Sequence, residues 1–195
     1  MRKVQPGNHL TSQLLNLYYV SATATRANGS NDSYVSEEED EAELVKALLA
    51  DPSAKPLLSL LAVEGDRPVG HVLFTHASLM KSQHSGAQHP IALLAPLAVV
   101  PECQRRGIGR QLIEQGLHQL SHRGIDLVFV LGYPRYYSRH GFEPAFPFGL
   151  EPSYPIAAEH RDAWMVYALR PAVLGTVSGN VICADALNHP DYWQE

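Results

Sequence analysis

A stretch near the middle of the chain constrains the fold most, because its apolar and turn residues predict a strand, a helix and a second strand. Residues 91–100 and 125–131 are almost wholly apolar, which is typical of strands covered on both faces. Between them, residues 109–122 carry leucine and isoleucine at helical spacing, and Gly124 is a stop signal. The two strands of such a βαβ unit are parallel. Pro96 removes a ladder donor, so we expect a bulge or a splayed pairing there.

The flanking segments predict further strands and helices, so the fold class is α/β (α+β). Upstream of the central unit we expect an edge strand at 2–5, a helix at about 10–25 and an antiparallel hairpin of strands at 58–64 and 69–79. Downstream we expect a short helical or turn segment at 133–140 and a last strand at 164–169.

A second helix is expected to begin in the acidic run Glu37–Glu41, with Ser36 as its N-cap. Its apolar face would be formed by Leu44, Val45, Leu48 and Leu49. Acidic residues in a first turn suit the helix dipole, so this run is interpreted as a solvated helix start.

Length and composition favour one cytoplasmic domain. With 195 residues, we expect a domain at 1–170 and a C-terminal extension at 171–195 that packs on it or trails it. The N-terminal segment lacks the features of a signal peptide, and no apolar run is long enough to span a membrane. Two cysteines, Cys103 and Cys183, indicate free thiols in a reducing compartment. The net charge of −5 argues against nucleic acid as a partner and is compatible with a cationic substrate.

The turn between the first strand and the helix of the central unit has the chemistry of an anion site. Gly107 and Gly109 let a ligand approach the backbone, and free N–H groups at a helix start attract phosphate. Arg105, Arg106 and Arg110 add positive charge at the same place. The spacing fits neither a P-loop nor a dinucleotide-binding glycine motif. Taken alone, such a turn is equally compatible with a plain surface loop.

Two motifs resemble those of the GNAT N-acetyltransferase family. Residues Gln104-Arg105-Arg106-Gly107-Ile108-Gly109 resemble its Q/R-x-x-G-x-G/A acyl-CoA signature, and Leu97-Ala98-Val99-Val100-Pro101 is similar to its L-x-V-x-P strand end. Tyr137-Ser138-Arg139-His140-Gly141-Phe142 resembles its Y-x-x-x-G-F motif. The order of elements agrees to about Arg170, and Leu131-Gly132-Tyr133-Pro134 resembles a turn of the bacterial predicted N-acetyltransferase branch.

The resemblance implies a fold, a co-substrate and a reaction. The fold would be a mixed, mostly antiparallel sheet with a splayed parallel strand pair and flanking helices. Acetyl-CoA would bind along main-chain groups of Leu97, Ala98 and Val99, with its pyrophosphate on the segment formed by Gln104, Arg105, Arg106, Gly107, Ile108, Gly109 and Arg110. An acetyl group would pass to a primary amine by direct attack in a ternary complex, without a metal.

The resemblance also assigns the proton donor to the leaving thiolate. Tyr137 matches the family's tyrosine, and Tyr136 is the adjacent alternative. The general base is open, because residues 91–95 contain no carboxylate where many relatives place a glutamate. A water relay or one of the histidines His71, His76, His84 and His89 would have to replace it.

Several alternatives stay open beside this interpretation. The acceptor is either a small-molecule amine or a peptide or protein amine, and a homodimer is as open as a monomer. A non-catalytic acyl-CoA-binding sensor would keep the same loop without needing a general acid. Acetylation of charged tRNA is disfavoured by the net negative charge of the chain, because binding RNA phosphates usually requires a basic face. His118 and His122 have the i, i+4 spacing of metal ligands but lack the H-E-x-x-H pattern, so a solvated helix face is favoured.

Overall fold

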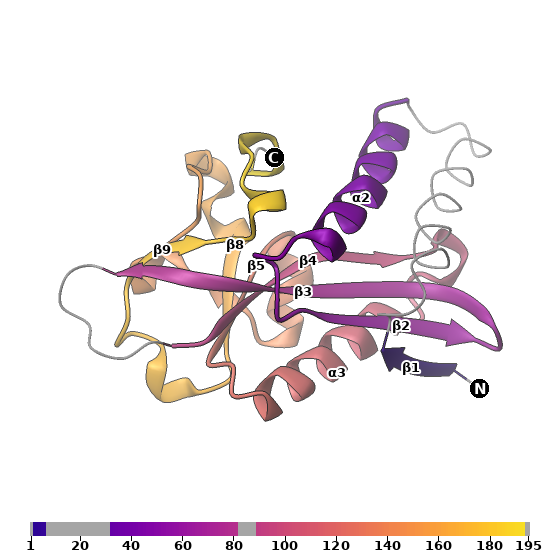
Figure 1. Ribbon diagram of the computed structural model, residues 1–195, viewed down its shortest axis with the longest axis horizontal. Helices are drawn as coiled ribbons and strands as arrows, with labels where there is room; N and C mark the ends of the chain where they lie inside the picture. The colour runs from indigo at the N-terminus through magenta and orange to yellow at the C-terminus, as the bar shows by residue number, and fades with distance from the viewer. Residues whose placement is uncertain (1, 7–31, 82–88, 194–195) are drawn as a thin grey trace.

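The computed structural model describes residues 2–6, 32–81 and 89–193, with side chains described at 3–6, 41–80 and 89–193. The helix expected at 10–25 and His84 lie outside the described residues. The main sheet follows the order β1-β2-β3-β4-β5-β8-β6 (Figure 1). Its strands are β1 Arg2–Pro6, β2 Leu58–Glu64, β3 Arg67–Lys81, β4 Ile91–Val99, β5 Leu127–Leu131, β8 Trp164–Ala168 and β6 Glu143–Pro144.

The pairing along this sheet is antiparallel except between β4 and β5. The helix α3 Ile108–His122 connects these two strands, so the predicted βαβ unit is confirmed. The hairpin of β2 and β3 and the edge position of β1 are confirmed as well. The fold is therefore the expected mixed, mostly antiparallel sheet, with β4 and β5 as the splayed parallel pair.

Strand β4 leaves its parallel partner after a few residues. Only Ile91 to Leu93 pair with β5, opposite Leu127 to Phe129. On its other side, Val72 of β3 pairs with Leu97 and Phe74 pairs with Leu94, so three steps along β4 match two along β3. The extra residue lies beside Pro96, which has no N–H to donate to a ladder. The bulge and the splay expected from Pro96 are both present.

Two helices flank the sheet. In Figure 1, α2 Asp32–Ala50 and α3 lie on opposite sides of the strand ribbons.

The expectation that Ser36 caps α2 is wrong, because the helix begins at Asp32. Residues 32–36 contain neither glycine nor proline, so nothing in them stops the helix from extending upstream. Leu44, Val45 and Leu48 are buried as expected. Within the described ranges, no helix is long and apolar enough to cross a bilayer.

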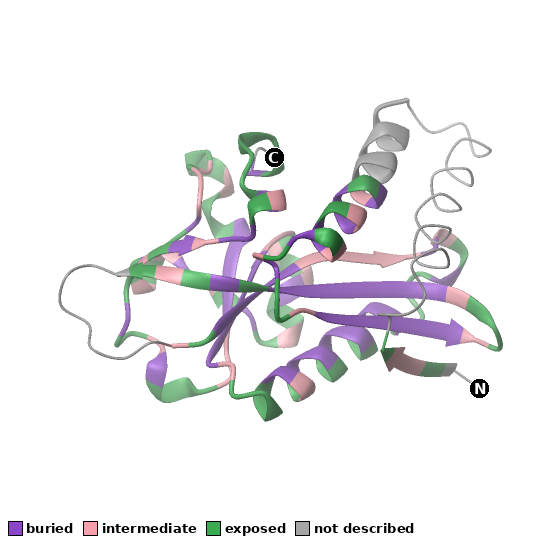
Figure 2. Ribbon diagram, in the orientation of Figure 1, coloured by how far each residue is buried: buried purple, intermediate pink, exposed green. Residues whose placement is uncertain are grey.

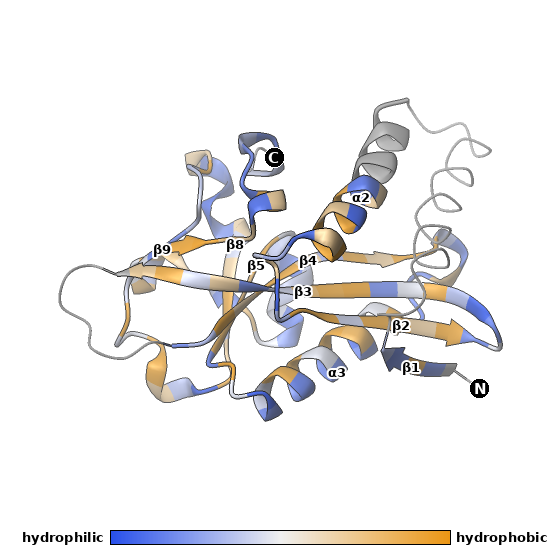
Figure 3. Cartoon of the chain, in the orientation of Figure 1, coloured by the Kyte–Doolittle hydropathy of each residue, from blue (hydrophilic) through white to orange (hydrophobic). Residues whose placement is uncertain are grey.

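The core has two main parts, because apolar residues alternate between the faces of the central strands. Leu94 and Val128 pack with the α3 side chains Leu112 and Ile113, and the neighbouring Leu93 and Phe129 pack in the second cluster. Figure 2 shows β2 and β3 as largely buried, and Figure 3 shows the same strands as largely hydrophobic. Such strands hold the loops at their ends in fixed positions.

The C-terminal residues add a strand that the sequence did not predict. Strand β9 Gly179–Ile182 pairs with the far end of β3 and with β7 Leu150–Glu151. Trp193 is 3% exposed and contacts Trp164 edge to face, with 5.6 Å between ring centroids. The remaining short helices are α4 Pro134–Tyr137 and 3₁₀ turns at Pro101–Cys103, Ser138–His140, Phe146–Phe148, Ala158–Ala163, Pro171–Val173, Asp185–Leu187 and Pro190–Trp193.

Candidate active site

The loop before α3 presents backbone N–H groups to solvent. Gly107 is the N-cap residue at φ 80° and ψ 10°, a left-handed conformation that favours glycine, and no side chain caps the helix. Arg105 also has a positive φ of 56°. Because the first N–H groups of a helix have no partner within it, those of Ile108, Gly109 and Arg110 are available to a ligand. With the helix dipole they form a site suited to phosphate.

The arginines around this loop differ in what they contact. Arg106 donates to Glu64 at 2.9 Å, and Arg110 donates to Glu114 at 2.7 Å. In the part of the chain that the structure describes, Arg105 and Arg139 form no ion pair. Two guanidinium groups near the start of α3 are therefore available to an anion.

The end of β4 offers an open edge beside the same loop. The N–H of Val100 donates to Val69 on β3, and backbone groups alternate in direction along a strand. The groups of Ala98 therefore point toward β3, and those of Leu97 and Val99 point away from it. The Gln104 side chain donates to the outward carbonyl of Val99 at 3.1 Å. This amide links the open strand edge to the phosphate loop.

A first cavity of about 720 Å³ joins these features. Most of the predicted site residues line it: Leu97, Val99, Gln104, Arg105, Gly107, Ile108, Gly109, Arg110, Tyr136 and Tyr137. Ala98 and Arg106 do not line it. The cavity also includes Arg139 and His140, to which the sequence assigned no role although both lie inside the Y-x-x-x-G-F motif.

Tyr137 lies at the inner end of this cavity. It is the last residue of α4 and is 8% exposed. Its ring packs edge to face on Tyr136 and Phe142, and a Cβ at Gly132 would overlap it. Burial, and to a smaller degree Tyr136 and Glu41, raise the pKa of Tyr137 well above its usual value of 10. Its hydroxyl therefore stays protonated near neutral pH and can donate a hydrogen bond.

Tyr136 occupies a different place. Its hydroxyl oxygen lies directly over Gly109, where a Cβ would overlap it. Burial raises the pKa of Tyr136 as well. The hydroxyl of Tyr136 therefore lies against the first turn of α3, at the phosphate loop.

A second cavity, of about 300 Å³, lies at the splay of β4, beside the first one. Leu97 and Tyr137 line both. Side chains from β4, β5, α2 and the C-terminal turns surround the second cavity, and Glu41 is its one charged residue among the described ones. Sequence reasoning missed Glu41, because an acidic run at a helix start also fits a solvated face. The helical spacing from Glu41 to Leu44 and Leu48 places Glu41 on the apolar face, but this local pattern does not show that the face borders a cavity.

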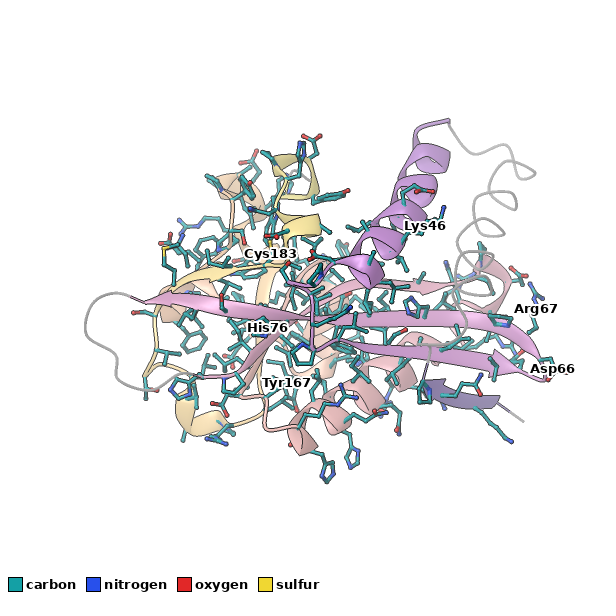
Figure 4. The ribbon with its side chains drawn as sticks, in the orientation of Figure 1. Lys46, Asp66, Arg67, His76, Tyr167 and Cys183 are labelled. Carbon is teal, nitrogen blue, oxygen red and sulfur yellow. The ribbon has the colours of Figure 1, made fainter. Side chains whose placement is uncertain are left out.

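Of the predicted histidines, the three that the structure describes line neither cavity. His71 is fully buried and shares a 2.9 Å hydrogen bond with Ser59. His76 is exposed on β3 (Figure 4). His89 contacts Asp126 at 2.7 Å, at the opposite end of the parallel pair from the splay. None of these three lies where an acceptor would meet Tyr137.

His118, His122 and the two cysteines form no metal site or disulfide among the described residues. His118 and His122 are exposed, with 3.2 Å between their Nε2 atoms, and no group of three or more side chains that could hold a metal ion is found in the described ranges. Cys103 and Cys183 are free and buried, and Cys103 lines the first cavity. Arg106 donates to the Sγ of Cys103 at 3.3 Å.

Comparison with known proteins identifies the family. Residues 17–142 match the model of the acetyltransferase (GNAT) family. The chain is 47% identical over 146 residues to the uncharacterized N-acetyltransferase YjhQ of Escherichia coli K12, covering 74% of this chain and 78% of that protein.

Two solved structures have a similar fold. The GNAT N-acetyltransferase YhbS from Escherichia coli in complex with CoA has a TM-score of 0.68 at 31% identity, covering 77% of this chain and 79% of that one. A GNAT acetyltransferase from Brucella melitensis in complex with acetyl-CoA has a TM-score of 0.65 at 25% identity, covering 96% and 98%. The matched sequence, the splayed strand pair and the phosphate loop together show that this chain belongs to the GNAT acetyltransferase family.

Proposed function

We propose that the protein is an N-acetyltransferase that moves an acetyl group from acetyl-CoA to a primary amine within a ternary complex. The observation that carries the proposal is that two cavities share Leu97 and Tyr137 among their lining residues. One cavity has the chemistry of a phosphate site, and the other has a carboxylate that suits an ammonium group. Direct transfer requires two such sites that share one junction.

The first cavity fits the shape and charge of CoA. The uncapped start of α3 suits the pyrophosphate, as do the guanidinium groups of Arg105 and Arg139, which form no ion pair with another described residue. The outward backbone groups of Leu97 and Val99 suit an extended amide arm, which would add to the sheet like a strand. Ala98 is the weakest of the three strand positions for this role, since its backbone groups point toward β3. The YhbS and Brucella melitensis structures, which hold CoA and acetyl-CoA, support this assignment.

The second cavity would hold the amine beside the reacting carbonyl. When bound, acetyl-CoA supplies an acetyl thioester, and the amine nitrogen attacks its carbonyl carbon as the C–S bond breaks. The nitrogen gives up two protons overall; one ends on the sulfur and the other in solvent. No protein nucleophile is needed, so the site requires a proton donor near the sulfur and a group that receives the ammonium.

Tyr137 is the donor in this proposal. It lines both cavities, and its raised pKa keeps its hydroxyl protonated until the thiolate departs. A hydrogen bond donated to developing negative charge in a buried place lowers the barrier more than the same bond would in water.

Replacement of Tyr137 by Phe tests the assignment. We expect kcat to fall by about a hundredfold, the low end of the range for a lost general acid, with the Kd for CoA changed by less than about threefold. Tyr133→Phe is the matched control, because Tyr133 is 65% exposed on the same turn and should have no effect. An unchanged kcat in Tyr137→Phe would remove the tyrosine from the mechanism.

The order of binding gives a second test. A ternary complex predicts intersecting lines when the initial rate is measured against both substrates, whereas an acetylated enzyme would give parallel lines. If the protein binds acetyl-CoA tightly but releases no CoA thiol with any amine of a broad panel, the alternative of an acyl-CoA-binding sensor is correct.

A further inference from the structure

The second cavity has a composition that selects among amines. Its described lining contains the single charged side chain of Glu41, the hydroxyls of Tyr137 and Tyr192, and otherwise apolar side chains from four elements. Glu41 lies three residues before the buried Leu44, on the inward side of α2, and is itself half-buried. Glu41 and Tyr137 line this same cavity.

The C-terminal turns form a fixed aromatic wall opposite α2. Trp193 is buried against Trp164, and its indole N–H donates to the Leu187 carbonyl at 3.0 Å. Tyr192 is 42% exposed beside it and lines the same cavity. The backbone of this wall is tied to the end of α2 by Asp51, which accepts from the N–H of Ala186 at 2.9 Å. The wall is therefore pre-organised for an apolar group rather than assembled around it.

We propose that this cavity binds an apolar monoamine, with the ammonium group on Glu41 and the hydrocarbon body against the Leu187–Trp193 wall. This inference rests on the proposed N-acetyltransferase function and names the acceptor class for the same site.

The charges of the residues that line the cavity disfavour two other classes of amine. An amino acid would bring its own carboxylate into an apolar cavity beside Glu41, and the described residues that line this cavity include no cation to pair with it. A polyamine would bury a second, unpaired ammonium group.

The size of the cavity agrees with this class. An apolar cavity of about 150 Å³ is enough for a benzene ring. A volume of about 300 Å³ therefore accommodates one ring, or a branched alkyl group, with a short chain that carries the nitrogen. 2-Phenylethylamine has these features and is the probe we choose.

Glu41 has two tasks in this arrangement. It pairs with the ammonium group and so orients the nitrogen toward the junction at Tyr137. It also takes the first of the two protons that the nitrogen gives up, which frees the lone pair that attacks the thioester carbon, and passes that proton to solvent. The second proton leaves the nitrogen as the amide forms and replaces the proton that Tyr137 gives to the sulfur.

The test compares Glu41→Gln with the wild-type protein in binding and in turnover. Binding of 2-phenylethylamine to the CoA complex, measured by titration calorimetry, should weaken by about tenfold or more, because a charge-assisted hydrogen bond is lost. Binding of CoA itself should not change. Glu43→Gln is the matched control, since Glu43 is an exposed carboxylate on the same helix. Glu41→Asp keeps the charge and should recover part of the amine affinity, which a merely structural role would not require.

The acceptor panel separates failure of this inference from failure of the proposed function. We expect wild-type kcat/KM to be at least about tenfold higher for 2-phenylethylamine than for phenylalanine or putrescine. Turnover of putrescine or phenylalanine in preference to 2-phenylethylamine would overturn the acceptor class and leave the N-acetyltransferase in place. CoA release with none of the amines would overturn the function itself. Unchanged amine binding in Glu41→Gln would remove Glu41 from the site.

Discussion

The hydroxyl of Tyr136 lies over the Cα of Gly109, so one tyrosine of the predicted catalytic pair contacts the first turn of α3. Its neighbour Tyr137 points instead to the junction of the two cavities. Adjacent residues of a short helix project in different directions, which separates their roles. In the mechanism that we propose, Tyr136 supports the loop before α3, and Tyr137 is the proton donor.

Gly109→Ala should weaken CoA binding by about tenfold, as measured by titration calorimetry, because the new methyl group displaces the Tyr136 ring into the cavity. The double variant Gly109→Ala/Tyr136→Phe should recover most of the affinity, since the next atom of that ring lies 3.5 Å from where the added methyl carbon would sit, an ordinary contact. Tyr136→Phe alone should keep nearly wild-type kcat. Failure of the double variant to recover would show that the two residues are not in contact.

Arg139→Gln should raise the Kd for CoA by about threefold to tenfold, because a free guanidinium group beside the phosphate loop is lost at an exposed position. Arg106→Gln is the control. Its guanidinium is directed to Glu64, so the Kd should change by less than about twofold. The difference between the two variants should shrink as salt is added to the titration, since screening weakens exposed charge pairs. An equal rise of the Kd for CoA in both variants would mean that an arginine contributes to CoA binding whether or not it is paired with a carboxylate.

The central part of this site could be predicted because its signals are local. Strand 91–100, the glycine turn and the helix after it are encoded by neighbouring residues, and Pro96 marks the splay without reference to any other element. Glu41 could not be found in this way. An acidic run at a helix start has the same local pattern whether it meets solvent or a cavity, and the contact with Tyr137 depends on how α2 packs on the splay.

Strand β9 shows a second limit of local reasoning. Its four residues, Gly179–Ile182, carry little apolar periodicity, and they form a strand because the end of β3 extends beyond β2 and offers an edge. The same holds for the aromatic wall, whose tryptophan is buried only because residues 150–164 lie beneath it. Contacts that join distant segments set both features, and a single sequence does not show such contacts.

Asp51→Ala should loosen the wall of the acceptor cavity. Asp51 accepts hydrogen bonds from Ser53 and from the N–H of Ala186, and Ser53 in turn accepts from the N–H of Asp185. These bonds, led by the Ser53 hydroxyl, lower the pKa of Asp51 below its usual 3.8, so they persist at neutral pH. Without them, we expect amine binding to weaken by about tenfold, while CoA binding changes by less than about twofold.

Tryptophan fluorescence provides a measurement that does not depend on the acceptor. The chain has two tryptophans, and both are buried, so in a Trp164→Phe background the emission reports on Trp193 alone. Asp51→Ala should shift this emission to longer wavelength as the indole meets water. Asp66→Ala is the control, because Asp66 is exposed in the turn between β2 and β3 (Figure 4). An unshifted spectrum in Asp51→Ala would show that Asp51 does not hold the wall.

His71 should make the fold sensitive to mild acid. Burial lowers the pKa of His71 from 6.5 to about 3, so between these values the unfolded chain binds a proton that the folded chain refuses. The free energy of unfolding should therefore fall by about 1.4 kcal/mol for each pH unit below 6.5, or about 2 kcal/mol at pH 5. Urea unfolding at pH 7.5, 6.5 and 5 measures this slope.

In His71→Gln the free energy of unfolding at pH 7.5 should fall by about 1–3 kcal/mol, because the Ser59 hydrogen bond is disturbed. The further fall in this free energy toward pH 5 should be smaller than in the wild type. His76→Gln changes an exposed imidazole on the same strand and should keep the wild-type slope. Parallel slopes in wild type and His71→Gln would locate the acid sensitivity in the carboxylates instead.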